Sequence, residues 1–195
     1  MVLMLKMRFV TLNQQIKTLT KCLELPAVET NTDQKLFILS KICSLHHHLS
    51  KLVTLFNEIF GVNMLTMFAF NFIAITVALV FGSAAIQWGD TRWWVYTFIV
   101  VSCCCYGIDC LYSCGVCHST VEQASMMGVL IHKIKTENHD VIDEIEMFSL
   151  QMANEKVEFS AAEFFPINNT LIFSIIGGVT TYIIILIQLS STLNH

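Results

Sequence analysis

Charged residues are scarce in this sequence, making up 13% of its 195 residues, whereas roughly 25% is usual for soluble domains. Proline is rare as well, with two residues, while 54% of the chain is hydrophobic. The net charge is −4, and neither a basic run nor a glycine-rich phosphate loop is found, so we expect no nucleic-acid partner. Scarce charge combined with a mean hydropathy of +0.62 predicts a membrane protein.

Three uncharged or nearly uncharged stretches are long enough to cross a bilayer, which takes roughly 20 apolar residues. The first, from Leu65 to Ile86, contains no charged residue. The second runs from about Trp93 to Leu111 and contains Asp109, and the third runs from Leu171 to Leu189. The sequence therefore predicts an all-α membrane protein with transmembrane helices over residues 62–88, 92–112 and 168–190.

The remaining segments are mixed in polarity and helical in their apolar spacing. Of the eleven Lys and Arg residues, seven precede the first span and three lie in residues 113–166. Basic residues favour the cytosolic side of a membrane. We therefore expect a cytosolic helical segment over 1–60, cytosolic anchor helices over 113–166 with a break and a new N-cap near Asn138, and an extracellular tail over 191–195.

Six of the eight cysteines lie between Cys103 and Cys117, and we interpret them as small apolar side chains in a packed helix. Cys114, Cys117 and His118 match the C-x-x-C-H pattern of haem attachment, and zinc bound with Cys110 is an alternative. Both are disfavoured at the end of a membrane helix. Adjacent His46, His47 and His48 point in different directions and indicate a polar helix face. We predict no metal, no cofactor and no enzyme activity, because no catalytic constellation is present.

Asp109 is a lone carboxylate within a predicted span. Intramembrane acids are functional candidates by default. Its position near the cytosolic end favours a structural role, and a role in ion passage or gating is the alternative.

The third span carries a polar stripe along one side. At 100° per residue, seven positions fall within about 40° of one line, and six of them are polar or small: Thr170, Ser174, Gly178, Thr181, Ile185, Gln188 and Thr192. Buried polar groups without partners cost free energy in lipid. The stripe therefore either packs closely against another helix, with Gln188 in an interhelical hydrogen bond, or faces water in a pore between subunits.

Thr181-Tyr182, five apolar residues and Gln188 match the T-Y-(five hydrophobic)-Q signature of insect gustatory receptors. The preceding phrase from Phe159 to Gly178, FSAAEFFPINNTLIFSIIGG, also resembles that family. The resemblance implies the last three helices of a seven-helix receptor. It also implies a ligand-gated, non-selective cation channel in the plasma membrane of chemosensory neurons, opened by a small-molecule tastant and built as a homo- or hetero-tetramer.

The resemblance also assigns roles within the stripe. It places Gln188 at the narrow extracellular part of a pore, with Ile185 and Leu189 at its apolar gate. Ser174, Gly178, Thr181 and Thr192 would line the path, and Tyr182, off the stripe, would lie against a neighbouring helix. Four of the family's spans are missing, so we expect a fragment or truncated form, and the ligand-binding residues stay unknown. The alternatives are a non-conducting accessory subunit, an odorant-type receptor of the same superfamily, and the C-x-x-C-H haem or metal protein.

Overall fold

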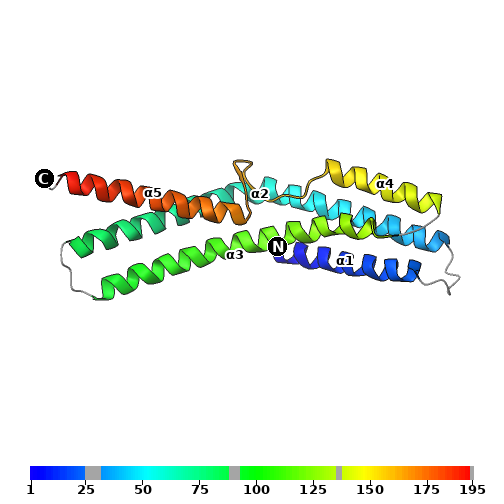
Figure 1. Ribbon diagram of the computed structural model, residues 1–195, viewed down its shortest axis with the longest axis horizontal. Helices are drawn as coiled ribbons and strands as arrows, with labels where there is room; N and C mark the ends of the chain where they lie inside the picture. Colours follow the sequence, from blue (N-terminus) through cyan, green and yellow to red (C-terminus); the bar gives the residue numbers. More distant parts are fainter. Residues whose placement is uncertain (25–31, 88–92, 135–137, 194–195) are drawn as a thin grey trace. The chain divides into compact units, whose positions relative to one another are not determined.

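The computed structural model describes the backbone of residues 1–24, 32–87, 93–134 and 138–193, and side chains except those of 22–24, 32–35, 86–87 and 189–193. Within these residues the chain consists of helices, one small hairpin and short connecting segments (Figure 1). The helices are α1 (Val2–Glu24), α2 (Thr32–Gln87), α3 (Trp93–Ile131), α4 (His139–Asn154) and α5 (Asn169–Leu193). The hairpin pairs β1 (Ser160–Ala161) with β2 (Phe165–Pro166).

The predicted spans over 62–88, 92–112 and 168–190 correspond to parts of α2, α3 and α5, apart from Asn168, which precedes α5, and residues 88 and 92, which lie outside the described residues. Three described helices are long and apolar enough to cross a membrane, with candidate segments Leu36–Ala85, Trp93–Ile131 and Asn169–Gln188. The prediction of an all-α membrane fold with three such helices is confirmed. Helix α2 is unbroken from Thr32, within the predicted cytosolic segment, to the end of the first predicted span. Helix α3 likewise continues past Leu111, where the second predicted span ends, to Ile131. Where the membrane begins and ends along α2 and α3 therefore stays a prediction.

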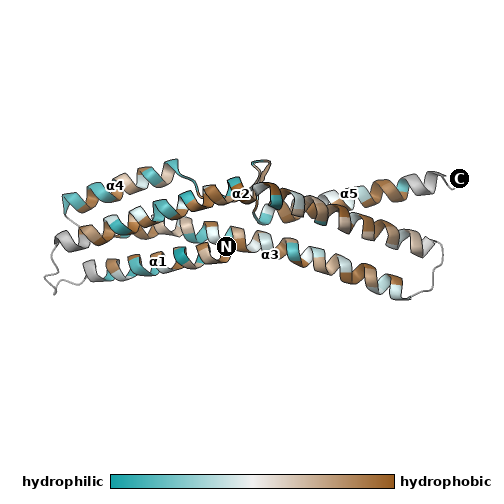
Figure 2. Ribbon diagram, turned by 180° about the vertical axis from the view of Figure 1, so that it is seen from behind, coloured by the Kyte–Doolittle hydropathy of each residue, from teal (hydrophilic) through white to brown (hydrophobic). Residues whose placement is uncertain are grey.

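The chain divides into two compact units. The first, residues 1–59 and 116–159, contains α1, α4, the first part of α2 and the last part of α3. Apolar residues of α1 recur every three or four positions and are buried, as expected for one helix face: Leu5, Phe9, Leu12, Ile16 and Leu19. Figure 2 shows hydrophilic residues scattered over α1 and α4, and exposed apolar residues such as Met4 and Met147 lie on the same two helices.

Asparagine side chains cap the N-termini of two of the helices. Oδ1 of Asn138 accepts hydrogen bonds from the backbone N–H groups of Asp140 and Val141, at 2.9 and 3.3 Å. Oδ1 of Asn168 does the same for Thr170 and Leu171 at the start of α5, at 2.9 and 3.2 Å. Such caps satisfy N–H groups that have no partner inside the helix. The predicted break with a new N-cap at Asn138 is confirmed.

The second unit, residues 60–115 and 160–195, contains the apolar part of α2, the first part of α3, the hairpin and α5. Figure 2 shows that hydrophobic residues dominate these helices. The hairpin lies close to Gly61 of α2. A Cβ atom built on this glycine would lie only 2.8 Å from the backbone N of Ala162. The ring of Phe165 contacts Phe68 of α2 edge to face, with centroids 6.2 Å apart. These contacts fix the segment from which α5 starts.

The sequence predicts no hairpin at residues 160–166, because the turn there lacks the usual residues. Its turn places Ala162 at φ 50° and Glu163 at φ 62°, and the N–H of Phe164 donates to the carbonyl of Ala161 at 3.0 Å. Two successive positive φ angles are typical of hairpin turns that carry Gly, Asn or Asp. Because alanine and glutamate stand there instead, the usual sequence signal of a tight turn is absent.

Candidate pore-lining helix

Helix α5 packs on the second unit through one face. Val179 is the most deeply buried of its described side chains, with 7% of its surface exposed. Ile172, Ile175, Ile183 and Leu186, on the same side of the helix, are partly buried. These residues lie on the side opposite the predicted polar stripe. The intramolecular contacts of α5 therefore use the apolar face and leave the stripe directed away from most of the unit.

The described polar residues of the stripe are exposed within the chain. The side chains of Ser174, Thr181 and Gln188 are all exposed. The hydroxyl of Thr181 donates to the carbonyl of Gly177 at 2.8 Å, and that of Ser174 donates to the carbonyl of Thr170 at 3.3 Å. A hydroxyl that donates to its own helix keeps its lone pairs as acceptors. The stripe thus presents oxygen acceptors, the atom type that coordinates cations and water.

Ile185 lies in the stripe between Thr181 and Gln188, and 53% of its surface is exposed. An isoleucine between polar neighbours forms a short apolar band on an otherwise polar line. The other predicted gate and lining positions, Leu189 and Thr192, belong to α5, but their side chains lie outside the described residues. Their predicted roles are untested.

Gly178 and Tyr182 connect the edge of the stripe to α2. A Cβ built on Gly178 would lie 3.1 Å from Cε2 of Phe72, so the glycine permits a close approach of that ring. The ring of Tyr182 meets Phe72 edge to face, with centroids 6.5 Å apart and an interplanar angle of 88°. Gly178 and Tyr182 thus both contact a helix of the same chain, and their predicted roles stay predictions. Nothing in the linear sequence indicated Phe72 as their shared partner.

Asp109 has a partner on α2. The Nδ2 group of Asn71, a residue only 3% exposed, donates to Oδ2 of Asp109 at 3.1 Å and to Sγ of Cys110 at 3.4 Å. One buried amide thereby joins α2 to two neighbouring residues of α3. Asp109 itself is exposed within the chain. Asp109 is thus hydrogen-bonded to a neighbouring helix, and its structural role stays a prediction.

The C-x-x-C-H residues are not brought together around one point. Cys114 and Cys117 are buried, whereas His118 is exposed. Across the residues that the structure describes, no group of three or more His, Cys, Asp or Glu side chains could hold a metal ion. The arrangement is that of small side chains packed along a helix.

His46 differs from its sequence interpretation. The prediction of a polar helix face is wrong for this residue, which is 3% exposed. Its ring lies between Phe9 of α1 and Phe148 of α4, with both centroids 5.4 Å away, and Nε2 is 3.2 Å from the carbonyl oxygen of Ala124 in α3. Since a carbonyl only accepts, Nε2 carries the proton. His46 is therefore a core residue at which all four helices of the first unit meet.

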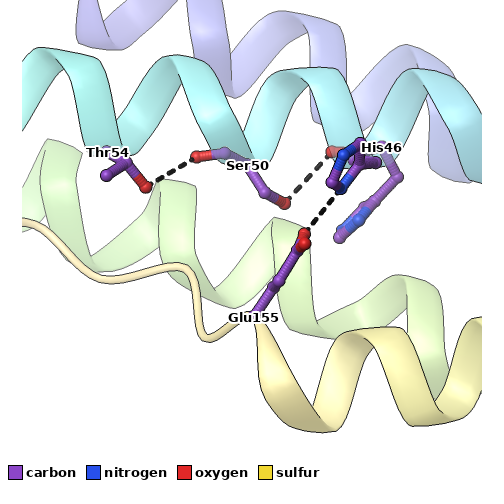
Figure 3. A network of polar contacts seen from close by, with 5 residues as sticks. His46, Ser50, Thr54 and Glu155 are labelled. Carbon is purple, nitrogen blue, oxygen red and sulfur yellow. Dashed lines mark hydrogen bonds and ion pairs between the residues drawn. The ribbon is translucent and has the colours of Figure 1, made fainter.

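A polar network continues from His46 along α2 (Figure 3). The hydroxyl of Ser50 donates to the His46 carbonyl at 3.1 Å, and that of Thr54 donates to the Ser50 carbonyl at 3.4 Å. Glu155, at the end of α4, reaches the next histidine, with its Oε2 2.7 Å from Nδ1 of His47. Of the three adjacent histidines, His46 is thus buried, whereas His47 is hydrogen-bonded to Glu155.

Three long apolar helices, one with a polar stripe, define a multi-pass α-helical membrane protein. The chain belongs to the 7tm chemosensory receptor family, whose profile matches residues 1–193. The gustatory receptor for bitter taste 66a of Drosophila melanogaster is 27% identical over 157 residues, which cover 77% of this chain and 30% of that receptor. Gustatory receptor 68a of the same species is 26% identical over 137 residues, which cover 68% of this chain and 35% of that receptor. The resemblance to insect gustatory receptors is confirmed.

A solved structure supports the same fold. The insect olfactory receptor OR5 from Machilis hrabei, determined in complex with eugenol, superposes with a TM-score of 0.70 and 18% sequence identity. The superposition covers 93% of this chain and 45% of OR5. The chain thus spans less than half of the length of these relatives.

Proposed function

We propose that α5 lines the pore of a ligand-gated, non-selective cation channel and that the chain acts as a subunit of a gustatory receptor. The observation that carries this proposal is the division of α5 into two faces. Val179 and its apolar neighbours pack on α2 and α3, while Ser174, Thr181, Ile185 and Gln188 are exposed within the chain. The hydroxyl oxygens of Ser174 and Thr181 keep acceptor lone pairs, and hydrocarbon would leave these unsatisfied at a cost in free energy, so this face suits contact with water.

The stripe has the chemistry of a simple gated path. Oxygen acceptors of Ser174 and Thr181 favour cations over anions. The exposed side chain of Ile185 narrows and dewets the closed pore, as apolar constrictions do in channels. Leu189 acts with it as the gate, and Gln188 lies at the narrow extracellular part. Outward movement of the helices then withdraws the Ile185 side chain from the path, exposes the Gln188 amide to it and admits hydrated ions.

The stimulus is a small-molecule tastant. The curated relatives are gustatory receptors, one of them named for bitter taste, and OR5 is solved with the small molecule eugenol. The plasma membrane of chemosensory neurons is the corresponding location, with the C-terminus extracellular. This orientation follows the concentration of Lys and Arg in residues 1–60 and 113–166.

A pore lined by one helix per chain needs several subunits, and we assign a homo- or hetero-tetramer. Helix α2 offers a surface for such contacts. Four apolar side chains at seven-residue spacing are exposed along its first part: Ile38, Leu45, Leu52 and Ile59. A seven-residue repeat of apolar side chains is typical of helices that pair with another helix.

Cysteine accessibility tests the pore assignment. Thr181→Cys and Ile185→Cys would be expressed in cells, with the chain alone and together with a related gustatory receptor, and a cationic thiol reagent applied during current recording. We expect the reagent to reduce the cation current for both variants. Ile183→Cys is the matched control, because Ile183 lies on the packing face. The change in current of the unsubstituted chain on addition of the reagent gives the background from the native free cysteines.

The outcomes separate the candidate functions. A current that reacts at Ile183→Cys but at neither stripe position would contradict a pore along this stripe. A current found only with the related receptor, and insensitive to all three substitutions, would identify the chain as a non-conducting accessory subunit. Ile185→Ala adds an independent readout, since removal of an apolar gate should raise the basal current, whereas Ile183→Ala should not.

A further inference from the structure

A cavity of about 270 Å³ lies among α2, α3 and α5 within the second unit. Its walls are almost entirely hydrocarbon, and they include Leu79 of α2, Gly107 and Cys110 of α3, and Val179, Thr180 and Ile183 of α5. A Cβ built on Gly107 would meet nothing within 4 Å, so the missing side chain at this position leaves open space in the wall. The cavity adjoins the packing face of α5, on the side opposite its polar stripe.

The polar atoms in the lining are already engaged. The hydroxyl of Thr180 donates to the carbonyl of Ile176 at 2.8 Å, and Sγ of Cys110 accepts from Nδ2 of Asn71 at 3.4 Å. A compact polar ligand would find little here to orient it, because such ligands are held by a few placed hydrogen-bonding groups. The occupant that this lining suits is hydrocarbon.

The depth and the size of the cavity restrict the occupant further. All of its lining residues lie in the three segments that are apolar enough to cross a membrane. Two turns of an α-helix with side chains fill on the order of 1,000 Å³, far more than the cavity holds, whereas a single extended hydrocarbon chain is narrow enough to enter. An empty cavity of this kind forfeits the dispersion contacts of its walls.

We propose that this cavity binds one acyl chain of a membrane phospholipid, seated between α2 and α3 and against α5. The chain contacts protein on three sides and differs in this respect from lipid at the outer helix faces. By filling the space behind Val179 and Ile183, it supports the packing face of α5. The proposal goes beyond the channel function, and lipid binding can be measured on protein that conducts no current.

Photolabelling in a bilayer tests the site. The chain would be reconstituted in phosphatidylcholine nanodiscs containing a small fraction of phosphatidylcholine with a diazirine midway along one acyl chain, irradiated, digested and mapped by mass spectrometry. We expect labelling of cavity residues, such as Cys110 and Val179, to exceed that of exposed residues such as Phe98 and Phe173 several-fold. Gly107→Leu should abolish the excess, because the new side chain occupies the cavity.

Gly115→Leu is the matched control. Gly115 lies on the same helix and also has nothing within 4 Å of a built Cβ, but it does not line the cavity. Its labelling should equal that of the unsubstituted chain. Circular dichroism and size-exclusion elution verify that both variants fold. If Gly107→Leu does not fold, Ile183→Ala gives the opposite test, since a larger cavity should increase the labelling.

Two results would overturn the proposal. The first is equal labelling of cavity and outward-facing residues that neither Gly107→Leu nor Ile183→Ala changes, which means that only bulk lipid is present. The second is an excess labelling of cavity residues that Gly115→Leu removes as fully as Gly107→Leu does, because Gly115 does not line the cavity and the labelling would then not depend on the space at Gly107.

Discussion

The side-chain amide of Asn71 lies 3.1 Å from the carboxylate of Asp109 and joins α2 to α3 within their apolar segments. The same Nδ2 group also donates to Cys110. Hydrogen bonds between membrane helices contribute about 0.6 kcal/mol on average and up to about 1.7 kcal/mol. Because Asn71 is buried, this pair fixes the relative position of the two helices on which α5 packs.

Asn71→Leu keeps a side chain of similar volume but removes the amide. We expect it to lower the free energy of unfolding in detergent by about 1 kcal/mol and to reduce the thermal midpoint. Asp109→Asn retains an oxygen that accepts from Asn71 and should change the midpoint less. Asn63→Leu, at an exposed position of the same helix, is the control. A midpoint that rises in Asn71→Leu would show that the pair does not stabilise the chain.

Gly61 and Gly115 predict opposite effects of the same substitution. In Gly61→Ala the new Cβ would lie 2.8 Å from N and 3.1 Å from Cα of Ala162, so the hairpin backbone must move, at a cost of about 1–3 kcal/mol. Gly115 has open space around its Cβ position, so Gly115→Ala gains helix propensity of up to about 1 kcal/mol. Thermal unfolding followed by circular dichroism should show a lower midpoint for the first variant and a higher one for the second. Equal shifts would rule out a close approach of the hairpin to Gly61.

Glu163 carries backbone strain that glycine would relieve. Its φ of 62° places an exposed, non-glycine residue in the left-handed region, which costs about 1–2 kcal/mol. Glu163→Gly should therefore raise the thermal midpoint, with little lost because the side chain is exposed. Glu163→Ala removes the same carboxylate and keeps the strain, so it should give no comparable gain. If both variants behave alike, the effect comes from the carboxylate and not from the backbone.

His46 predicts how the stability of the first unit depends on pH. Burial lowers the pKa of His46. The hydrogen bond to the Ala124 carbonyl and the nearby Glu155 oppose this shift, and His47 adds to it. The folded state thus favours the neutral ring, and folding is penalised once the ring is protonated. Stability should be constant above the unfolded pKa of about 6.5 and fall as the pH drops below it towards the lower folded pKa.

Thermal midpoints measured across this pH range check the prediction for His46. His46→Gln cannot titrate and should flatten the decline, even if its midpoint is lower throughout. His118→Gln, at an exposed position, should retain the slope of the unsubstituted chain. A slope that His46→Gln leaves unchanged would assign the pH dependence to other groups.

The sequence predicted the helices well where local signals were strong. The uncharged run from Leu65 to Ile86 extends over about six helical turns, and the cap at Asn138 acts within one turn. Both signals lie in contiguous residues, so the spans and the cap could be found without tertiary information. The hairpin at residues 160–166 was missed, because Ala162 and Glu163 occupy positions where glycine or asparagine usually mark a turn. The burial of His46 was missed for a different reason, since its partners Phe9, Ala124 and Phe148 come from three other helices.

By itself, the sequence determined that this protein is an all-α membrane protein of the chemosensory receptor type, and it placed Thr181, Ile185 and Gln188 on one side of a helix. Hydrophobicity and helical periodicity are properties of neighbouring residues, so they can be read along the chain. Only the tertiary structure decided which side of α5 packs on α2 and α3, that Phe72 contacts Tyr182, and that Asn71 holds Asp109. These relationships join residues that are 38 to 110 positions apart, and packing in three dimensions selects them.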